Sequence, residues 1–110
     1  MDTTQVLKGL LDTAVLAIVA REDTYGYDII RRLREAGFDG VGEASVYGTL
    51  RRLYRGGYLT SQIVPSEEGP PRKYYGINAA GRDLLERSTK TWTHLAAVMN
   101  DLLDLTEEAA

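Results

Sequence analysis

Between residues 41 and 58 the chain carries hydroxyl and guanidinium groups at spacings that gather them on one helix. Val46, Leu50 and Leu53 stand at i, i+4 and i+7, which predicts a narrow apolar stripe along that helix. The polar side chains that fall largely off this stripe are Ser45, Tyr47, Thr49, Arg51, Arg52 and Arg55. Such groups contact phosphates and base edges when a helix lies in a DNA groove. Taken alone, the segment also fits a surface helix with solvated arginines.

Other kinds of chemistry have little support in the sequence. The chain has no cysteine, and its single histidine, His94, has no second ligand at metal-binding spacing. No phosphate-binding loop or pair of carboxylates in an apolar pocket is evident. We therefore expect no enzyme activity, no cofactor and no metal. The lack of cysteine, of a membrane-spanning run and of a signal peptide predicts a cytoplasmic protein that does not bind membranes.

The charges are unevenly distributed, although the formal net charge is −3. Residues 45–75 contain five basic and two acidic side chains, namely Arg51, Arg52, Arg55, Arg72 and Lys73 against Glu67 and Glu68. Residues 96–110 contain four acidic side chains and no basic one. A molecule polarised in this way can hold a phosphate backbone at one end while remaining acidic overall.

The periodicity of the apolar residues predicts three helices followed by two strands. The helices are expected over residues 4–21, 24–37 and 41–58, with Tyr27 and Ile30 on the buried side of the second helix and Gly37 at its end. After Gly57 the pattern alternates, which predicts strands over residues 58–64 and 72–78 around a proline-rich turn. The predicted fold is therefore mainly α with a small β-hairpin, a winged helix-turn-helix.

A long last helix is predicted to start at Ala79, capped by Asn78, and to run to about residue 105. Its apolar side chains recur as in a coiled coil. At roughly 40 Å this helix is longer than a domain roughly 27 Å across, so it must overhang and find a partner. We expect a winged-helix domain over residues 1–78 and a dimerisation helix over residues 79–110, within one compact domain. The expected homodimer interface consists of Leu7, Leu11, Leu85, Trp92, Leu95, Met99 and Leu102.

Three motifs in this order resemble the PadR-like transcriptional regulators. They are T-Y-G-Y-D-I-I at residues 24–30, S-V-Y-G-T-L-R-R-L at 45–53 and E-G-P-P-R-K-Y-Y at 68–75. The resemblance covers nearly the whole chain and, with one long helix after the wing, is to the short subfamily. It implies a homodimeric repressor that binds a palindromic operator in double-stranded DNA and is released by a small molecule. Some short members hold flat aromatic compounds at the dimer centre against a tryptophan, and Trp92 stands at the matching position.

The sequence departs from the family pattern at two places in the helix over residues 41–58, which is the recognition helix of this family. Gly42-Glu43 replaces a common Ser-Pro at the helix start, where glycine is still a fair N-cap and Glu43 suits the positive helix end. Gly48 follows Tyr47 where proline is common, which costs helix propensity of roughly 1 kcal/mol relative to alanine. Neither change threatens the fold, but both bear on which bases are read.

The resemblance and the charge pattern together predict two sets of site residues. The expected DNA contacts are Tyr25, Ser45, Tyr47, Thr49, Arg51, Arg52, Arg72 and Lys73. The expected ligand-binding residues are Trp92, Leu95, Ala96 and Met99. For Tyr47 the alternative is packing against the second helix, and for Trp92 it is a place in the dimer core. The alternative for the whole protein is a winged-helix module that binds other proteins and no operator.

Overall fold

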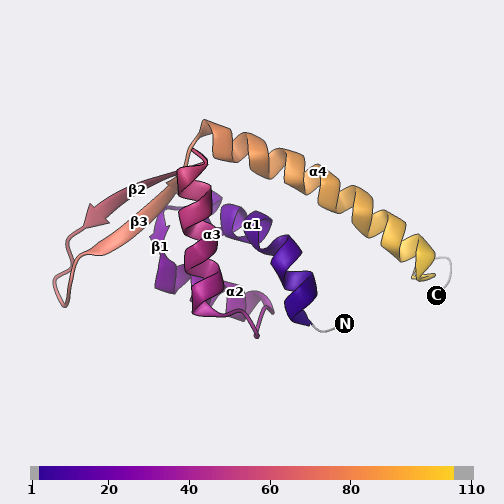
Figure 1. Ribbon diagram of the computed structural model, residues 1–110, viewed down its shortest axis with the longest axis horizontal. Helices are drawn as coiled ribbons and strands as arrows, with labels where there is room; N and C mark the ends of the chain where they lie inside the picture. The colour runs from indigo at the N-terminus through magenta and orange to yellow at the C-terminus, as the bar shows by residue number, and fades with distance from the viewer. Residues whose placement is uncertain (1–2, 106–110) are drawn as a thin grey trace.

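The computed structural model describes residues 3–105 and has the predicted order of elements with one additional strand (Figure 1). Its elements are α1 (Thr3–Arg21), β1 (Thr24–Tyr25), α2 (Gly26–Ala36), α3 (Glu43–Arg55), β2 (Leu59–Val64), β3 (Arg72–Ile77) and α4 (Ala79–Leu102). The predicted fold class is confirmed. The strand β1 is missing from the prediction because two residues are too few to show an alternating pattern.

The three strands form one antiparallel sheet in the order β1-β3-β2. The hairpin pairs Leu59 with Ile77 at its base and Val64 with Arg72 near its tip. On the other side of β3, Thr24 pairs with Tyr75. The second helix was expected from residue 24, but it begins at Gly26, with Tyr25 in the N-cap position and no side-chain hydrogen bond there.

The core is centred on α1, against which α2, α3 and β3 pack (Figure 1). Its buried side chains are Leu11, Val15, Leu16 and Val19 of α1, Ile29, Ile30 and Leu33 of α2, Val46, Leu50 and Leu53 of α3, and Val41, Leu59 and Tyr75. Burial of one such side chain stabilises the fold by about 1.5–3 kcal/mol. The apolar stripe predicted for α3 is confirmed, and it decides which side of α3 faces outward.

The connection between α2 and α3 is short and sharply turned. Gly37 ends α2 with φ of 125°, a conformation that glycine adopts without steric cost. The N–H of Phe38 donates to the carbonyl oxygen of Leu33 at 3.0 Å, and Val41 is buried where α3 is about to begin. This connection is the turn of the helix-turn-helix.

The expected burial of Tyr27 is wrong. Its side chain is 63% exposed, whereas Gly26, Ile29 and Leu33 face the core. Successive helical residues are about 100° apart, so a stripe centred on Ile29, Ile30 and Leu33 leaves Tyr27 off its edge. The prediction paired Tyr27 with Ile30 and thereby placed the stripe too far round the helix.

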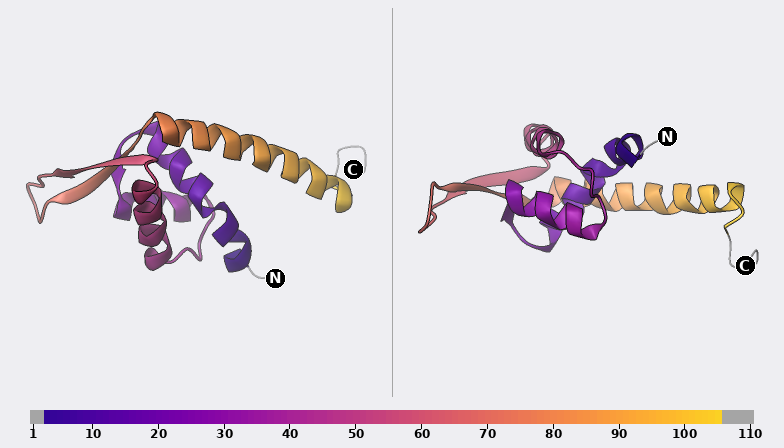
Figure 2. Two further views of the ribbon diagram at one scale, coloured as in Figure 1. Left: turned by 45° about the horizontal axis from the view of Figure 1, so that its top comes forward. Right: turned by 90° about the horizontal axis from the view of Figure 1, so that it is seen from below.

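The helix α4 begins at a well-defined cap and then leaves the body of the protein. The N–H of Gly81 donates to Oδ1 of Asn78 at 2.8 Å, and Nδ2 of Asn78 donates to the carbonyl oxygen of Gly57 at 2.8 Å. The molecule measures 55 × 28 × 20 Å, and both views in Figure 2 show the distal half of α4 clear of the other elements. The predicted cap and the predicted overhang are confirmed. Of the helices described, none is long and apolar enough to cross a bilayer.

Two glycines provide a matched test of how tightly α4 is seated. A Cβ atom at Gly81 would lie 2.2 Å from the carbonyl oxygen of Tyr58, whereas a Cβ at Gly48 would meet nothing within 4 Å. Gly81→Ala should therefore lower the free energy of unfolding by about 1–3 kcal/mol through overpacking. Gly48→Ala should raise it by up to about 1 kcal/mol through helix propensity. Urea denaturation followed by circular dichroism at one protein concentration measures both, and a Gly81→Ala variant as stable as the wild type would contradict the close contact.

Candidate nucleic-acid interface

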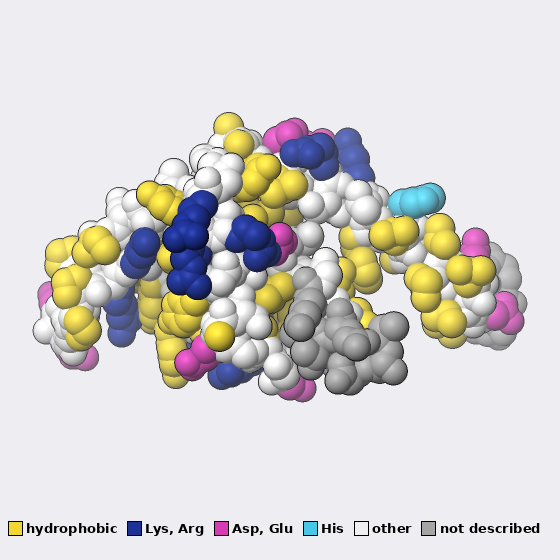
Figure 3. Space-filling view, viewed as in Figure 1, with side chains coloured by type: hydrophobic (Ala, Val, Ile, Leu, Met, Phe, Trp, Pro, Cys, Tyr) yellow, Lys and Arg dark blue, Asp and Glu magenta, His cyan; other side chains and the backbone are white. Residues whose placement is uncertain are grey.

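The outward side of α3 carries the arginines predicted from the sequence. Gly42 caps the helix in an extended conformation, Glu43 lies in its first turn, and Arg52 and Arg55 lie in its last turn, where charges of these signs favour the helix dipole. With Arg51, these arginines are exposed. Figure 3 shows Lys and Arg side chains gathered over α3 and further ones on the neighbouring strands.

The two hydroxyl residues of α3 lie in different environments. Ser45 is exposed, whereas Thr49 is only 4% exposed. Thr49 has little surface left for a base or a phosphate, so the structure groups it with the core side of α3 and not with the arginines. A hollow of about 350 Å³ lies beside them, lined by Leu11, Ser45, Gly48, Thr49 and Arg52.

The ring of Tyr47 packs against α2 and is also accessible. A Cβ atom at Gly26 would lie 2.3 Å from Cε1 of Tyr47, so this ring requires glycine at the first position of α2. The side chain of Tyr47 nevertheless remains 42% exposed. Packing against α2 therefore does not exclude the outward contact expected for Tyr47, although the sequence presented the two as alternatives.

The two cations at the start of β3 lie over different aromatic rings. The guanidinium carbon of Arg72 is 4.3 Å from the ring centre of Tyr25, whose ring is in turn 5.3 Å from that of Tyr74. Nζ of Lys73 lies 5.4 Å from the ring centre of Tyr54 on α3. Because neighbouring residues of a strand point to opposite faces, Lys73 lies on the face of the hairpin toward α3, and Arg72 lies on the other face with the ring of Tyr25.

A polar cluster at the start of α2 was not predicted. The carboxylate of Asp28 is buried and accepts hydrogen bonds from Thr24 Oγ1 at 2.7 Å, from Arg32 Nε at 2.8 Å and from Arg31. Burial would raise the pKa of Asp28, but these hydrogen bonds outweigh it and hold the pKa below its ordinary value of 3.8. Arg32 also donates to Glu22 at 2.5 Å. The signal in the sequence was an aspartate with arginines at i+3 and i+4.

The arginines of this cluster have a structural role and differ in this respect from those on the proposed interface. Arg31 and Arg32 are engaged with acidic partners near the sheet. Among the residues that the structure describes, Arg51 and Arg55 have no ion pair, so their charge is available on the surface.

The apolar seam of α4 is exposed in the single chain. The exposed fractions are 51% for Trp92, 50% for Leu95, 49% for Met99 and 75% for Leu102. Leu85 is partly buried against the core, and Ala96 is half-buried. Leu11 belongs to the core of its own chain at 4% exposure, which leaves little of it for a second chain. The side chain of Leu7 lies outside the described residues.

Trp92 borders two hollows between α4 and α1. One, of about 290 Å³, is lined by Leu10, Thr13, Ala14, Ala17, Phe38 and Trp92. The other, of about 330 Å³, includes Trp92 and Leu95 together with Arg87, Ser88 and Thr91. Of the predicted ligand-binding residues, Trp92 and Leu95 therefore line a hollow in the single chain, while Ala96 and Met99 line neither of these two. The main additions are the α1 residues, which the sequence offered no reason to choose.

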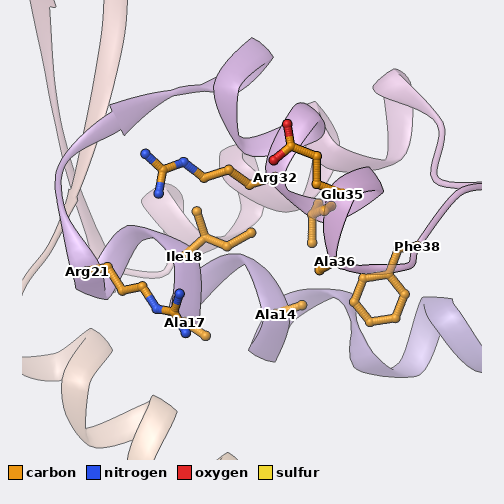
Figure 4. Close-up of a pocket in the computed structure, with 9 residues that line it drawn as sticks. Ala14, Ala17, Ile18, Arg21, Arg32, Glu35, Ala36 and Phe38 are labelled. Atoms are coloured by element: carbon orange, nitrogen blue, oxygen red, sulfur yellow. The ribbon is translucent and has the colours of Figure 1, made fainter.

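A larger hollow of about 510 Å³ continues from Phe38 between α1 and α2. Figure 4 shows its apolar floor of Ala14, Ala17 and Ile18, with Arg21 and Arg32 at one end and Phe38 at the other. Ala14, Ala17 and Phe38 are shared with the hollow beside Trp92. Both hollows thus border the same side of α1.

Comparison with known proteins connects this arrangement to gene regulation. A family model described as the transcriptional regulator PadR-like family matches residues 15–87. A PadR-like transcriptional regulator from Bacillus cereus is 35% identical, with 90% of this chain and 96% of that chain covered and a TM-score of 0.81. A Streptococcus transcriptional regulator is 31% identical, with coverages of 89% and 96% and a TM-score of 0.80. A PadR family regulator from Clostridium difficile is 29% identical, with coverages of 86% and 98% and a TM-score of 0.78.

Proposed function

This chain belongs to the PadR-like family of transcriptional regulators, and we propose that it is a homodimeric repressor that binds a palindromic operator. Regulators of this family bind DNA and are not enzymes. In the proposal, α3 enters the major groove and the β2–β3 hairpin lies beside it. Release of the operator by a small molecule, in the cytoplasm, completes the proposed cycle.

The observation that carries the proposal is the cationic surface formed by α3 and the hairpin. Arg51 and Arg55 are exposed on α3, and Lys73 lies above Tyr54 of the same helix. These side chains come from elements far apart in the sequence, and they meet on one side of a chain whose net charge is −3. A local concentration of cations on an acidic protein favours a polyanion at that surface and nowhere else.

The roles proposed for these cations differ according to their position. Arg51 lies on the outward side of α3, from which a guanidinium can reach a base edge. Lys73 and Arg72 lie on the hairpin, where they contact phosphates or the minor groove. Tyr25 supports Arg72 on the face of the sheet opposite to Lys73, because its ring lies directly under the guanidinium. Ser45 and Tyr47 flank Arg51 and complete the proposed contact set.

Arg51→Ala and Lys73→Ala should weaken DNA binding in different ways. Loss of Arg51 should cost about 1–3 kcal/mol on the preferred sequence and relax the preference for it. Loss of Lys73 should weaken binding to all sequences alike and reduce the salt slope by about 1. Gel-shift titrations at several salt concentrations measure this, with the region upstream of the protein's own gene and an unrelated duplex as probes.

Lys90→Ala on α4 is the matched control, since it removes an exposed lysine far from α3. It should leave both affinity and salt slope unchanged. If the wild-type protein preferred no DNA sequence, the operator proposal would be wrong and the protein-interaction module would take its place.

The exposed seam of α4 supports the homodimer. Trp92, Leu95, Met99 and Leu102 recur every three or four residues along a helix that has no other element beside its distal half. Burial of such a stripe would contribute a stabilising free energy of about 25 cal/mol for each Å² of apolar surface removed from water. A second copy of α4 offers the same stripe, so that a two-fold contact buries both at once.

Met99→Lys should convert the proposed dimer to a monomer, because it places an ammonium group in the apolar seam. Asn100→Lys adds the same charge at the next exposed position and serves as the control. Sedimentation equilibrium at micromolar concentrations should give twice the chain mass for the wild type and Asn100→Lys, and the chain mass for Met99→Lys. A wild-type protein that remained monomeric would exclude the dimer.

The hollows beside Trp92 support a small-molecule inducer with a flat aromatic body. An indole ring that is half exposed at the edge of an apolar hollow offers a stacking surface, and Phe38 lies on the same hollow. Such a compound lowers operator affinity only if it binds one arrangement of the dimer better than the other. The reciprocal effect must then hold, so that DNA weakens binding of the compound by the same factor.

Fluorescence of Trp92 should report this binding directly, because the chain has a single tryptophan. Saturable quenching by at least one flat aromatic compound is expected, with weaker binding in the presence of operator DNA. Thr13→Leu should reduce the quenching by filling the hollow, while Thr93→Leu should not, because Thr93 lines neither hollow. Absence of quenching across a panel of such compounds would indicate that Trp92 only packs in the dimer core.

A further inference from the structure

Arg52 differs from the other arginines on the outward side of α3. Its guanidinium donates to the carboxylate of Asp12 on α1, forty residues away in the sequence. Both side chains are accessible, with exposed fractions of 61% for Arg52 and 44% for Asp12. Within the described residues, no such ion pair involves Arg51 or Arg55. One of the three arginines on this face is therefore paired with an acidic side chain of α1.

This ion pair contributes little to the stability of the fold. Two exposed side chains gain little net free energy from pairing, because solvent screens the charges and both side chains lose conformational freedom. The packing of α1 against α3 is already secured by Leu11, Val46 and Leu50, which are almost completely buried. Asp12 also places a negative charge next to the surface proposed to receive phosphates, where it would repel DNA.

Arg52 has room for a second position. The hollow of about 350 Å³ lies directly beside it, lined also by Ser45 and Gly48. Long side chains on a helix lean toward its N-terminus and cover the residue four positions before them, which for Arg52 is Gly48. Nothing lies within 4 Å of the position that a Cβ of Gly48 would occupy. The guanidinium can therefore swing over Gly48 toward Ser45 and the outward face of α3.

We infer that Asp12 competes with DNA for Arg52, so that Arg52 is stored on Asp12 in the free protein and moves over Gly48 to a phosphate in the complex. This inference rests on the proposed function, since it concerns the same surface of α3. The exchange breaks one charge pair as it forms another, and it leaves Asp12 uncompensated near the DNA. Asp12 is thus a positioning residue that lowers the affinity for DNA through Arg52.

Asp12→Asn tests the exchange, because asparagine keeps the shape of the side chain and removes its charge. Binding should tighten about threefold to tenfold near 0.1 M salt, and the slope of log affinity against log salt should steepen by about 0.9, as for one additional phosphate contact. The probes are the duplex that the wild-type protein selects from a random library and a scrambled duplex of the same composition. Asp83→Asn, which removes the acidic partner of Arg87 in an exposed pair on α4, should change neither quantity.

A double-mutant cycle separates the exchange from simple repulsion between Asp12 and DNA. In an Arg52→Ala background, Asp12→Asn should change affinity and salt slope much less than in the wild type, since no arginine remains to be released. The same gain in both backgrounds, or no gain in the wild-type background, would overturn the inference while operator binding stands. Failure of the wild-type protein to bind any duplex would overturn the proposed function, and this inference with it.

Discussion

The burial of α1 is the constraint on which the rest of the structure depends. Its apolar face carries Leu11, Val15, Leu16 and Val19, and α2, α3, β3 and α4 all contact this helix. The core faces of α2 and α3 pack against α1 as well as against each other, because a single helix cannot bury its own apolar stripe. The outward direction of the α3 arginines follows from this packing. A change in the position of α1 therefore affects the whole cationic surface.

The basic side chains fall into two groups according to their surroundings. Arg31 and Arg32 of α2 are neutralised by Asp28 between them, and the carboxylate of Asp28 also accepts a hydrogen bond from Thr24 of β1. Apart from Arg52, which is paired with Asp12, the cations on α3 and the hairpin lie instead against aromatic rings or in open solvent, as Lys73 does above Tyr54. Rings leave the positive charge unneutralised while restricting where it can lie. This is how an acidic chain presents a cationic surface.

Sequence patterns predicted the elements well where the apolar pattern continues over several helical turns. The stripe of α3 and the overhang of α4 follow from apolar side chains at helical spacing, and the cap at Asn78 follows from a capping residue before such a pattern. The family assignment that the motifs suggested is confirmed. Short or rotational features were harder to predict. The strand β1 has two residues, and Thr49 and Tyr27 lie at stripe edges, where a small rotation of the helix exchanges inside and outside. The contact between Asp12 and Arg52 joins two helices and leaves no trace in either segment.

The position of α1 also bears on how a compound bound beside Trp92, as proposed, would affect the proposed DNA-contacting surface. Leu10 and Thr13 border the hollow with Trp92, while Leu11 and Asp12 between them meet α3 and Arg52. Protein interiors are close-packed and transmit strain, so a compound that displaced α1 on one side would also displace it on the other. The coupling is limited by how differently the compound binds the two positions of α1. A hollow that is only partly enclosed by one chain keeps that difference small, and a second copy of α4 across the seam would enlarge it.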